Sequence, residues 1–162
     1  LYLGEKKSHF SLLIDEKYQN FGLPNQIKIS NPILIEVESK KIINKIVNKG
    51  YFEAKAEIDS CKLQNSDFQC KLTIDIGEKY YFDSLFIEGE NEYLHRIFAK
   101  NLLKHYQRKP FSLNTLEQIK SDIDNIPYFE LAQPLDLDFN DILVNLLMSV
   151  HYQNGVWMVS LH

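Results

Sequence analysis

No stretch of this chain approaches the roughly 20 consecutive apolar residues that a membrane-spanning helix needs. The start also lacks the basic, apolar and small-residue pattern of a signal peptide, and the chain opens on Leu1 rather than Met. Residues 1–3 have the character of a strand whose beginning is missing. We therefore interpret the sequence as an internal fragment of a longer, processed protein, with any targeting signal upstream.

Patterns that carry catalysis or bind metals are also missing. There is no glycine-rich phosphate loop, no nucleophile elbow and no pair of carboxylates placed for acid–base chemistry. Asp136, Asp138 and Asn140 resemble the opening of a calcium loop, but Asp141 stands where glycine is required and Leu147 replaces the bidentate glutamate. The histidines have no zinc-type spacing: His9, His95, His105, His151 and His162. We predict neither an enzyme nor a metal or cofactor site.

Excess positive charge is absent as well. The 162 residues contain 18 Lys and Arg against 22 Asp and Glu, so the net charge is −4, and it is spread without long runs. This balance argues against binding a polyanion by bulk electrostatics, and we predict no nucleic-acid partner. The hydrophobic content of 44% is sufficient for the core of one ordinary domain or two small ones.

One unit of sequence occurs twice. Residues 45–58 form an amphipathic helix that runs through Gly50-Tyr51-Phe52 into an alternating strand. Residues 120–135 repeat this arrangement around Pro127-Tyr128-Phe129, at an offset of 77 residues (128 − 51 = 77). This repeat predicts two tandem copies of one small domain.

The spacing of apolar residues predicts the order β-α-α-β-β for the first copy. After the strand at residues 1–3, we expect helices over 10–21 and 35–47, joined by a loop. Gly22 and Gly50 are placed to end these helices. The strands follow at residues 52–58 and 70–76, joined by turn residues into an antiparallel hairpin.

The second copy repeats that order, with elements over residues 82–87, 94–102, 112–126, 129–139 and 144–150. Asn114 and Glu117 resemble a capping box for its second helix. Gln133 and Pro134 interrupt the strand over 129–139, and proline is tolerated mainly at a sheet edge or a bulge, so we expect an edge strand.

We therefore predict an α+β protein with two domains, each a three-stranded mixed sheet covered on one face by two helices. The domains span residues 1–79 and 80–152, and residues 153–162 are a tail or the start of a following β-barrel. The junction at residues 77–82 contains three consecutive aromatics and no proline, which favours a stiff connection between the two domains.

The chain resembles tandem polypeptide-transport-associated (POTRA) domains over nearly its whole length. The resemblance rests on the helix that runs into Gly50-Tyr51-Phe52, on the end of the strand at residues 74–80 and on the start of the next strand at residues 85–89. The structural motif residues are Gly50, Tyr51, Gly77, Gly89, Tyr128 and Phe129. Within that class the chain is most similar to the barrel subunit of the translocation and assembly module, TamA, because of its longer first helical region. Pro127 departs from the pattern, and residues 151–162 do not continue into a recognisable barrel.

This resemblance implies a periplasmic arm of an outer-membrane protein assembly machine. Such an arm receives unfolded outer-membrane polypeptides, contacts an inner-membrane-anchored or periplasmic partner protein and is attached to a membrane β-barrel. Division-site scaffolds and two-partner secretion transporters also carry POTRA-like domains, so both remain alternatives. A KH-like RNA-binding module shares the β-α-α-β core, but its Gly-x-x-Gly loop is missing here and the net charge is negative.

We predict that clients bind by adding a strand to an exposed sheet edge at residues 51–60. The binding residues are Phe52, Glu53, Ala54, Lys55, Ala56, Glu57 and Ile58. Unpaired backbone groups at such an edge accept many sequences. A second edge at residues 129–137 is weakened by Pro134, which has no amide hydrogen. The alternative is that Lys55 and Glu57 only protect the edge from aggregation.

Cys61 and Cys70 are the only cysteines, and a two-residue turn at Asn65-Ser66 places them opposite each other. Strict alternation, however, directs Cys70 to the buried face and Cys61 to the solvent face. A disulfide therefore requires a β-bulge near Ser60, and without that bulge both cysteines remain free thiols.

Overall fold

The computed structural model describes residues 10–64, 67–88, 92–126, 129–131 and 135–152. The chain divides into two compact units, Leu1–Glu78 and Lys79–His162, and the boundary lies one residue before the predicted one. Each unit contains a small mixed β-sheet with helices, so the predicted α+β fold class is confirmed. Within the described residues, no helix has both the length and the apolar character needed to span a membrane.

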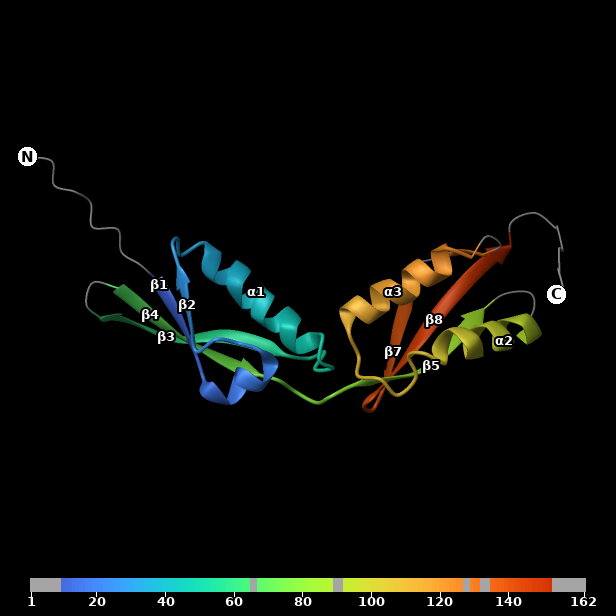
Figure 1. Cartoon of the computed structure of the whole chain (residues 1–162), viewed down its shortest axis with the longest axis horizontal. Coiled ribbons are helices and arrows are strands. Elements are labelled where there is room, and N and C mark those ends of the chain that lie inside the picture. Colours follow the sequence, from blue (N-terminus) through green and yellow to red (C-terminus); the bar gives the residue numbers. More distant parts are fainter. Residues whose placement is uncertain (1–9, 65–66, 89–91, 127–128, 132–134, 153–162) are drawn as a thin grey trace, which may run out of the picture. The chain divides into compact units, whose positions relative to one another are not determined.

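Unit 1 contains a four-stranded sheet rather than the predicted three-stranded one. Its strands lie in the order β2-β1-β4-β3, where β1 and β4 are parallel and the other neighbours are antiparallel. The helix α1 packs against one face (Figure 1) and buries Ile42, Ile46 and Val47. The bounds are β1 Phe10–Ile14, β2 Gln26–Ile29, α1 Leu34–Val47, β3 Lys55–Gln64 and β4 Asp67–Asp75.

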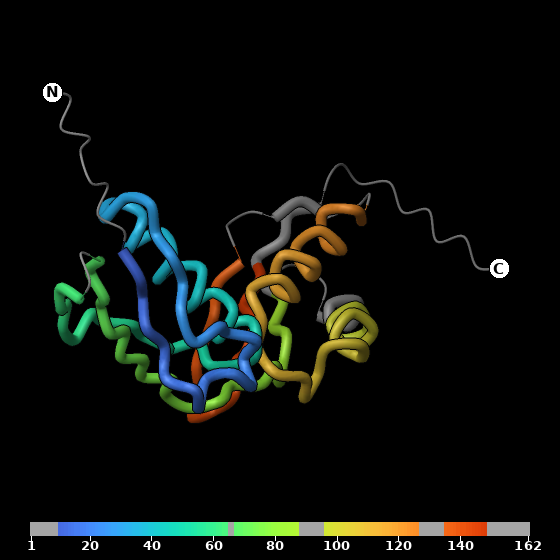
Figure 2. Tube along the Cα trace, turned by 60° about the vertical axis from the view of Figure 1, so that its left-hand side comes forward, coloured from blue at the N-terminus to red at the C-terminus, as the bar shows by residue number. Residues whose placement is uncertain are grey.

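The helix predicted over residues 10–21 is wrong. The chain forms strand β1 and then the short 3-10 helix η1, Glu16–Phe21, which ends at Gly22 with a φ of +72°. Figure 2 follows β1, η1 and β2 through one reversal before α1 begins. In β1 the neighbouring residues Ser11 and Leu12 are both buried, as is Ile14, so this strand lacks the strict alternation that marks a strand with one wet face.

Strand β2 likewise occupies a segment for which only a loop was predicted. It pairs with β1 in antiparallel register, with Phe10 opposite Ile29. The strand predicted at residues 1–3 lies outside the described residues. Over residues 10–64 and 67–78, unit 1 therefore contains one α-helix and one 3-10 helix in place of the two predicted α-helices.

Unit 2 follows the predicted β-α-α-β-β order, except that its second strand is divided into β6 and β7. Strand β8 lies in the middle, parallel to β5 on one side and antiparallel to β6 and β7 on the other. The divided strand pairs only with β8 among the described residues, at the edge position that Pro134 predicted. The bounds are β5 Tyr81–Glu88, α2 Glu92–Leu103, α3 Leu113–Asp124, β6 Phe129–Leu131, β7 Asp136–Asn140 and β8 Leu143–Tyr152.

Helix α3 begins where the sequence predicted it, at Ser112, but its cap differs from the predicted one. Ser112 has an extended backbone, and its side chain accepts a hydrogen bond from the Thr115 amide at 3.4 Å. The predicted capping box of Asn114 and Glu117 is wrong because Asn114 already lies inside the helix. The cap therefore sits two residues earlier than the capping-box pattern indicates.

A hydrogen bond joins the turn after α2 to α3. The Tyr106 hydroxyl donates to the Asp122 carboxylate at 2.8 Å. Burial raises the pKa of Tyr106, and the hydrogen bond to Asp122 adds to the shift. Hydrogen bonds from Gln118 and then from Tyr106 lower the pKa of Asp122 below its usual value.

The core of unit 2 forms around two fully buried aromatic rings. Phe82 and Phe111 lie with ring centroids 5.2 Å apart. We expect Phe82→Ala to lower the free energy of unfolding of unit 2 by about 3–5 kcal/mol, because it removes a ring from a closed site. Urea unfolding followed by far-UV circular dichroism measures this loss.

Phe52→Ala is the matched comparison in unit 1. The sequence places Phe52 on the buried side of a strand, but in the structure it precedes β3 and is 37% exposed. Its truncation should therefore cost clearly less than that of Phe82. Equal losses for the two substitutions would contradict this assignment of the cores.

Gly77 is required by backbone conformation and by a close contact. Its φ is +62°, and an added Cβ would lie 3.3 Å from the Cβ of Glu53. Gly22 has a similar φ of +72° with nothing within 4 Å of that position. We expect Gly22→Ala to cost about 1–2 kcal/mol from the left-handed conformation alone, and Gly77→Ala to cost more. Chemical unfolding compares the two, and an equal cost would show that the Glu53 contact contributes nothing.

Candidate polypeptide-binding edge

Strand β3 forms one edge of the sheet in unit 1. It pairs only with β4 among the described residues, so its other side is open. The strand begins at Lys55 rather than at Phe52, and it extends to Gln64. Phe52, Glu53 and Ala54, which were predicted as binding residues, therefore lie in the turn before the edge.

This turn anchors the start of β3. Gly50 is buried and has a φ of +107°, which redirects the chain after α1. The Tyr51 ring meets Phe21 edge-on, with centroids 5.4 Å apart, and Ala54 is buried. Gly50 and Tyr51 therefore shape and anchor this turn. The remaining motif residues, Gly89 and Tyr128, lie outside the described residues, as does the side chain of Phe129.

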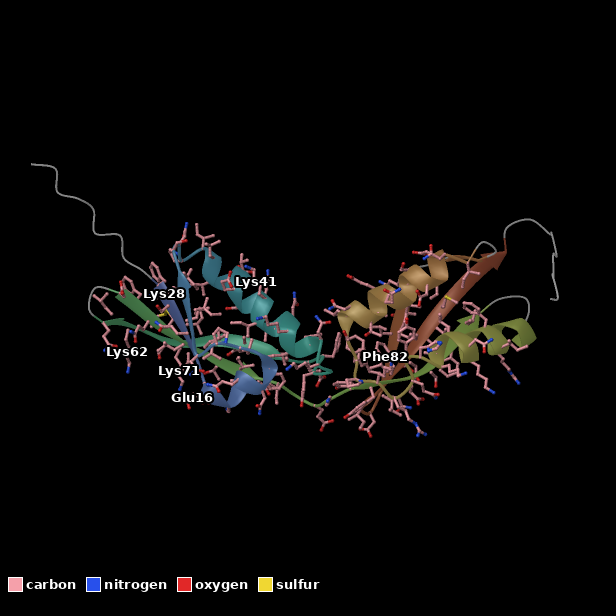
Figure 3. All side chains as sticks on the ribbon, viewed as in Figure 1. Glu16, Lys28, Lys41, Lys62, Lys71 and Phe82 are labelled. Atoms are coloured by element: carbon pink, nitrogen blue, oxygen red, sulfur yellow. A yellow bond between two sulfur atoms is a disulfide. The ribbon has the colours of Figure 1, made fainter. Side chains whose placement is uncertain are left out.

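A β-bulge divides β3 into two parts. The pairing with β4 shifts by one residue between Ile58 and Ser60, so Asp59 has no opposite residue. This shift brings Cys61 opposite Cys70, and the two form a disulfide (Figure 3). The bulge that the disulfide requires is thus present where the sequence placed it.

The bulge also places apolar side chains on a common face of the sheet. Side chains of directly opposite residues project from the same face, and Ala56, Ile58 and Cys61 lie opposite three buried residues of β4. Ile58 is nevertheless 45% exposed and Leu63 is 64% exposed. In Figure 1 the β3–β4 hairpin extends beyond the beginning of α1. The outer part of β3 therefore presents apolar side chains to solvent, whereas the sequence predicted a half-buried strand.

The register identifies the backbone groups that point outward. The Cα atoms of Cys61 and Cys70 are 4.0 Å apart, which is typical of a non-hydrogen-bonded antiparallel pair. In such a pair the N–H and C=O groups of each residue point away from the opposite strand. Cys61 therefore directs its backbone groups to the open edge, and so does Leu63 two residues later.

The same alternation along β4 extends this result across the bulge. Leu72 and Ile74 follow Cys70 at steps of two, so their partners Ile58 and Ala56 also direct backbone groups outward. The carbonyl of Ile74 accepts a hydrogen bond from the Tyr18 hydroxyl, which agrees with a non-hydrogen-bonded pair at Ala56. The amides of Lys55 and Glu57 instead point towards β4.

Charged side chains occupy the opposite face of the hairpin. Lys62 and Lys71 are labelled there in Figure 3, and the Lys71 ammonium lies 4.0 Å from the Asp59 carboxylate at the bulge. Both side chains are more than half exposed, so this ion pair contributes little to stability. The edge therefore combines outward backbone groups and apolar side chains with charges of both signs.

Leu63 is the edge residue that the sequence reasoning missed. The predicted edge ended at Ser60, where the alternation breaks, although a pair of Cys61 with Cys70 already requires the strand to continue towards the turn. Ile58, Cys61 and Leu63 belong to one face only if the extra residue at Asp59 is counted.

A comparison with protein-family models finds no match, and a comparison with curated proteins finds none either. Solved structures are similar. BamA from Haemophilus ducreyi lacking POTRA domains 1–3 matches with a TM-score of 0.60 and 14% identity, over 88% of this chain and 28% of that chain. POTRA domains 3–5 of BamA from Haemophilus influenzae match with a TM-score of 0.52 and 16% identity, over 91% of this chain and 66% of that one.

These similarities show that the chain has a POTRA-like fold. The chain spans less than a third of the first of these proteins and about two thirds of the second. At 14% and 16% sequence identity, these matches establish similarity of fold alone. The resemblance to POTRA domains that the sequence suggested is confirmed at that level.

The disulfide should stabilise the edge. It closes a loop with a sequence separation of 9, so its reduction should lower the free energy of unfolding of unit 1 by about 2–3 kcal/mol. Urea unfolding with and without a reductant measures the change, and mass spectrometry of the unreduced chain should show two fewer hydrogen atoms. The variant Cys61→Ala/Cys70→Ala should be insensitive to reductant. Thiol labelling of both cysteines in the untreated wild-type chain would contradict the bond.

Proposed function

We propose that this chain is the polypeptide-binding arm of an outer-membrane protein assembly or translocation machine and works in the periplasm. Its clients are unfolded outer-membrane polypeptides, and it also contacts an inner-membrane-anchored or periplasmic partner protein. Within this class we retain the resemblance to the TamA subunit as part of the proposal. The role is binding rather than catalysis. The POTRA-like fold and the open edge of β3 support it.

The observation that carries the proposal is the composition of the β3 edge. Ala56, Ile58, Cys61 and Leu63 direct backbone donors and acceptors outward, and an extended chain of almost any sequence satisfies them. The exposed side chains of Ile58 and Leu63 add apolar contact without demanding a particular partner residue. These properties suit an arm that handles many different unfolded chains.

The edge is also ordered before a client arrives. The disulfide holds β3 against β4 at its outer half, and the turn at Tyr51 and Ala54 holds its beginning. A preformed edge lowers the ordering cost of binding. The bulge at Asp59 separates the edge into two short segments, so each client strand pairs with one segment at a time.

Protection from aggregation is the competing explanation for the same features. Bulges and charged side chains both discourage edge-to-edge pairing. The exposed Ile58 and Leu63 argue against a purely protective edge, because apolar side chains there promote association.

Proline at Ala56 provides the test. The backbone amide of Ala56 points outward, so Ala56→Pro removes a donor from the open edge without removing a hydrogen bond between β3 and β4. We expect an uncharged peptide of alternating valine and serine, labelled with fluorescein, to bind the variant at least about tenfold more weakly. Fluorescence anisotropy measures the dissociation constant.

Two further substitutions make this result specific. Ala56→Val keeps the amide and should bind as the wild type does. Glu57→Pro removes an amide that points towards β4, so it should destabilise the hairpin itself. Unchanged peptide affinity in a folded Ala56→Pro chain would remove the β3 edge from the mechanism.

A further inference from the structure

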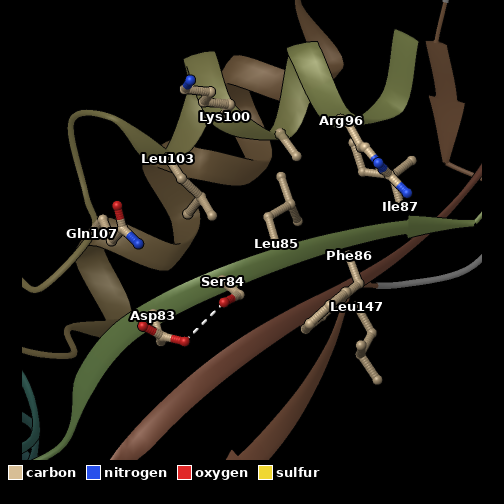
Figure 4. A pocket seen from close by; sticks show the side chains of 11 residues that line it. Asp83, Ser84, Leu85, Phe86, Ile87, Arg96, Lys100, Leu103, Gln107 and Leu147 are labelled. Carbon is tan, nitrogen blue, oxygen red and sulfur yellow. Dashed lines mark hydrogen bonds between the residues drawn. The ribbon is translucent and has the colours of Figure 1, made fainter. Parts of the chain in front are cut away.

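A groove in unit 2 runs between helix α2 and the edge strand β5. It has a volume of about 750 Å³, and its walls come from both elements (Figure 4). The lining includes every residue of β5 from Asp83 to Ile87. Because consecutive residues of a strand face opposite sides of the sheet, this groove wraps around the open edge of β5.

The edge of β5 opens where a neighbouring segment leaves it. The Phe82 amide donates to the Lys109 carbonyl at 3.0 Å, and the Phe82 carbonyl accepts from the Arg108 amide at 2.7 Å. These two bonds cover the beginning of the strand. From Asp83 onward, β5 makes no described backbone pairing on that side and is bonded only to β8.

The directions of the side chain and backbone groups of Phe82 indicate which backbone groups of β5 face the groove. Its side chain is buried in the core while both of its backbone groups point outward to residues 108 and 109. In one strand, residues with side chains on the same face direct their backbone groups to the same side. The pairing with β8 shifts by one residue between Phe82 and Leu85, which keeps Leu85 on the core face three residues after Phe82. Leu85 and Ile87 lie opposite Leu146 and Met148, which follow the Phe82 partner Val144 at steps of two, so their N–H and C=O groups point into the groove.

Apolar side chains lie above and below this edge. On the helix side, Leu103 of α2 is buried near Leu85 (Figure 4), and the buried Ala99 also lines the groove. On the other face, Phe86 and Leu147 are register partners that are 54% and 37% exposed. A strand added along β5 would therefore cover apolar surface on both of its faces.

Positive charge lines the helix side of the groove. Arg96 and Lys100 are both exposed and lie one helical turn apart on α2. Four residues of helix rise about 6 Å. Alternate residues of a strand are spaced by about 6.6–6.8 Å. Two acidic side chains at alternate positions of an added strand would thus match this pair, while the Asp83 carboxylate, which accepts a hydrogen bond from the Ser84 hydroxyl, lies at the other end.

We propose that the groove between α2 and β5 is a second strand-addition site, which takes an extended polypeptide segment with acidic side chains at alternate positions. This second site rests on the proposed function only because its occupant is also an extended polypeptide chain. The β3 edge carries charges of both signs and accepts neutral segments, whereas the β5 groove selects by charge. The two units would then bind different segments.

The test uses the full 162-residue chain and two fluorescein-labelled ten-residue peptides. One alternates valine with glutamate, and the other alternates valine with lysine. We expect the glutamate peptide to bind at least tenfold more tightly. Lys100→Glu should weaken glutamate-peptide binding at least tenfold, and Lys28→Glu, an equal charge change at an exposed side chain of β2 in unit 1, should alter it less than twofold.

A backbone variant separates this site from the β3 edge. Ile87→Pro removes an amide that points into the groove and should abolish binding of the glutamate peptide, while the uncharged valine–serine peptide still binds at β3. Ala56→Pro should have the opposite pattern. Circular dichroism establishes that each variant is folded, and Lys100→Gln replaces Lys100→Glu if that chain is not.

Two outcomes would overturn the second site. Unchanged affinity for the glutamate peptide in folded Lys100 variants and in Ile87→Pro would show that the groove does not bind it. Loss of glutamate-peptide binding in Ala56→Pro alone would assign both peptides to β3, which leaves the proposed function intact and removes only this site.

Discussion

The arrangement of both units depends on the backbone pairing of one strand, the last in each unit. Strand β4 lies between β1 and β3, and strand β8 lies between β5 and the β6–β7 pair. In each case the last strand is parallel to the first strand of its unit and antiparallel to the strand that precedes it. The strand before the last one pairs only with it among the described residues, so it lies at an edge.

This constraint explains why the candidate binding surfaces are strands rather than loops or clefts. An interior strand has all of its backbone groups paired, whereas an edge strand keeps half of them directed outward. In unit 1 the preceding strand, β3, is uninterrupted by proline and carries exposed apolar residues. In unit 2 that strand is divided around Pro134, and the first strand, β5, provides the longer continuous edge.

The two edges differ in the way that they are held and in the side chains around them. A disulfide fixes β3 to β4, and its outer half lies beyond the beginning of α1. Strand β5 is covered at its start by backbone bonds from residues 108 and 109 and then runs beneath α2, which adds basic side chains. Backbone pairing gives both edges affinity for extended chains, and the neighbouring helix or hairpin decides which side chains they favour.

The sequence by itself determined the elements that have one wet face. The stripe of α1, the alternation of β4 and the order of elements in unit 2 were predictable, since a half-exposed element shows its period directly. Turn residues marked the hairpin of β3 and β4. The edge position of the strand interrupted by Pro134 was predictable for a steric reason. The two cysteines also indicated where a bulge would have to lie.

Only the tertiary structure decided the rest. Strand β1 has buried residues on both faces, so its apolar run predicted a helix. Its pairing with β2 and β4 shows that it is a strand. The outward direction of the Ala56 amide depends on cross-strand register, which no local pattern contains. The groove beside β5 exists because α2 packs over that strand. Such contacts join residues distant in sequence, and periodicity, which reports only on neighbours, carries no information about them.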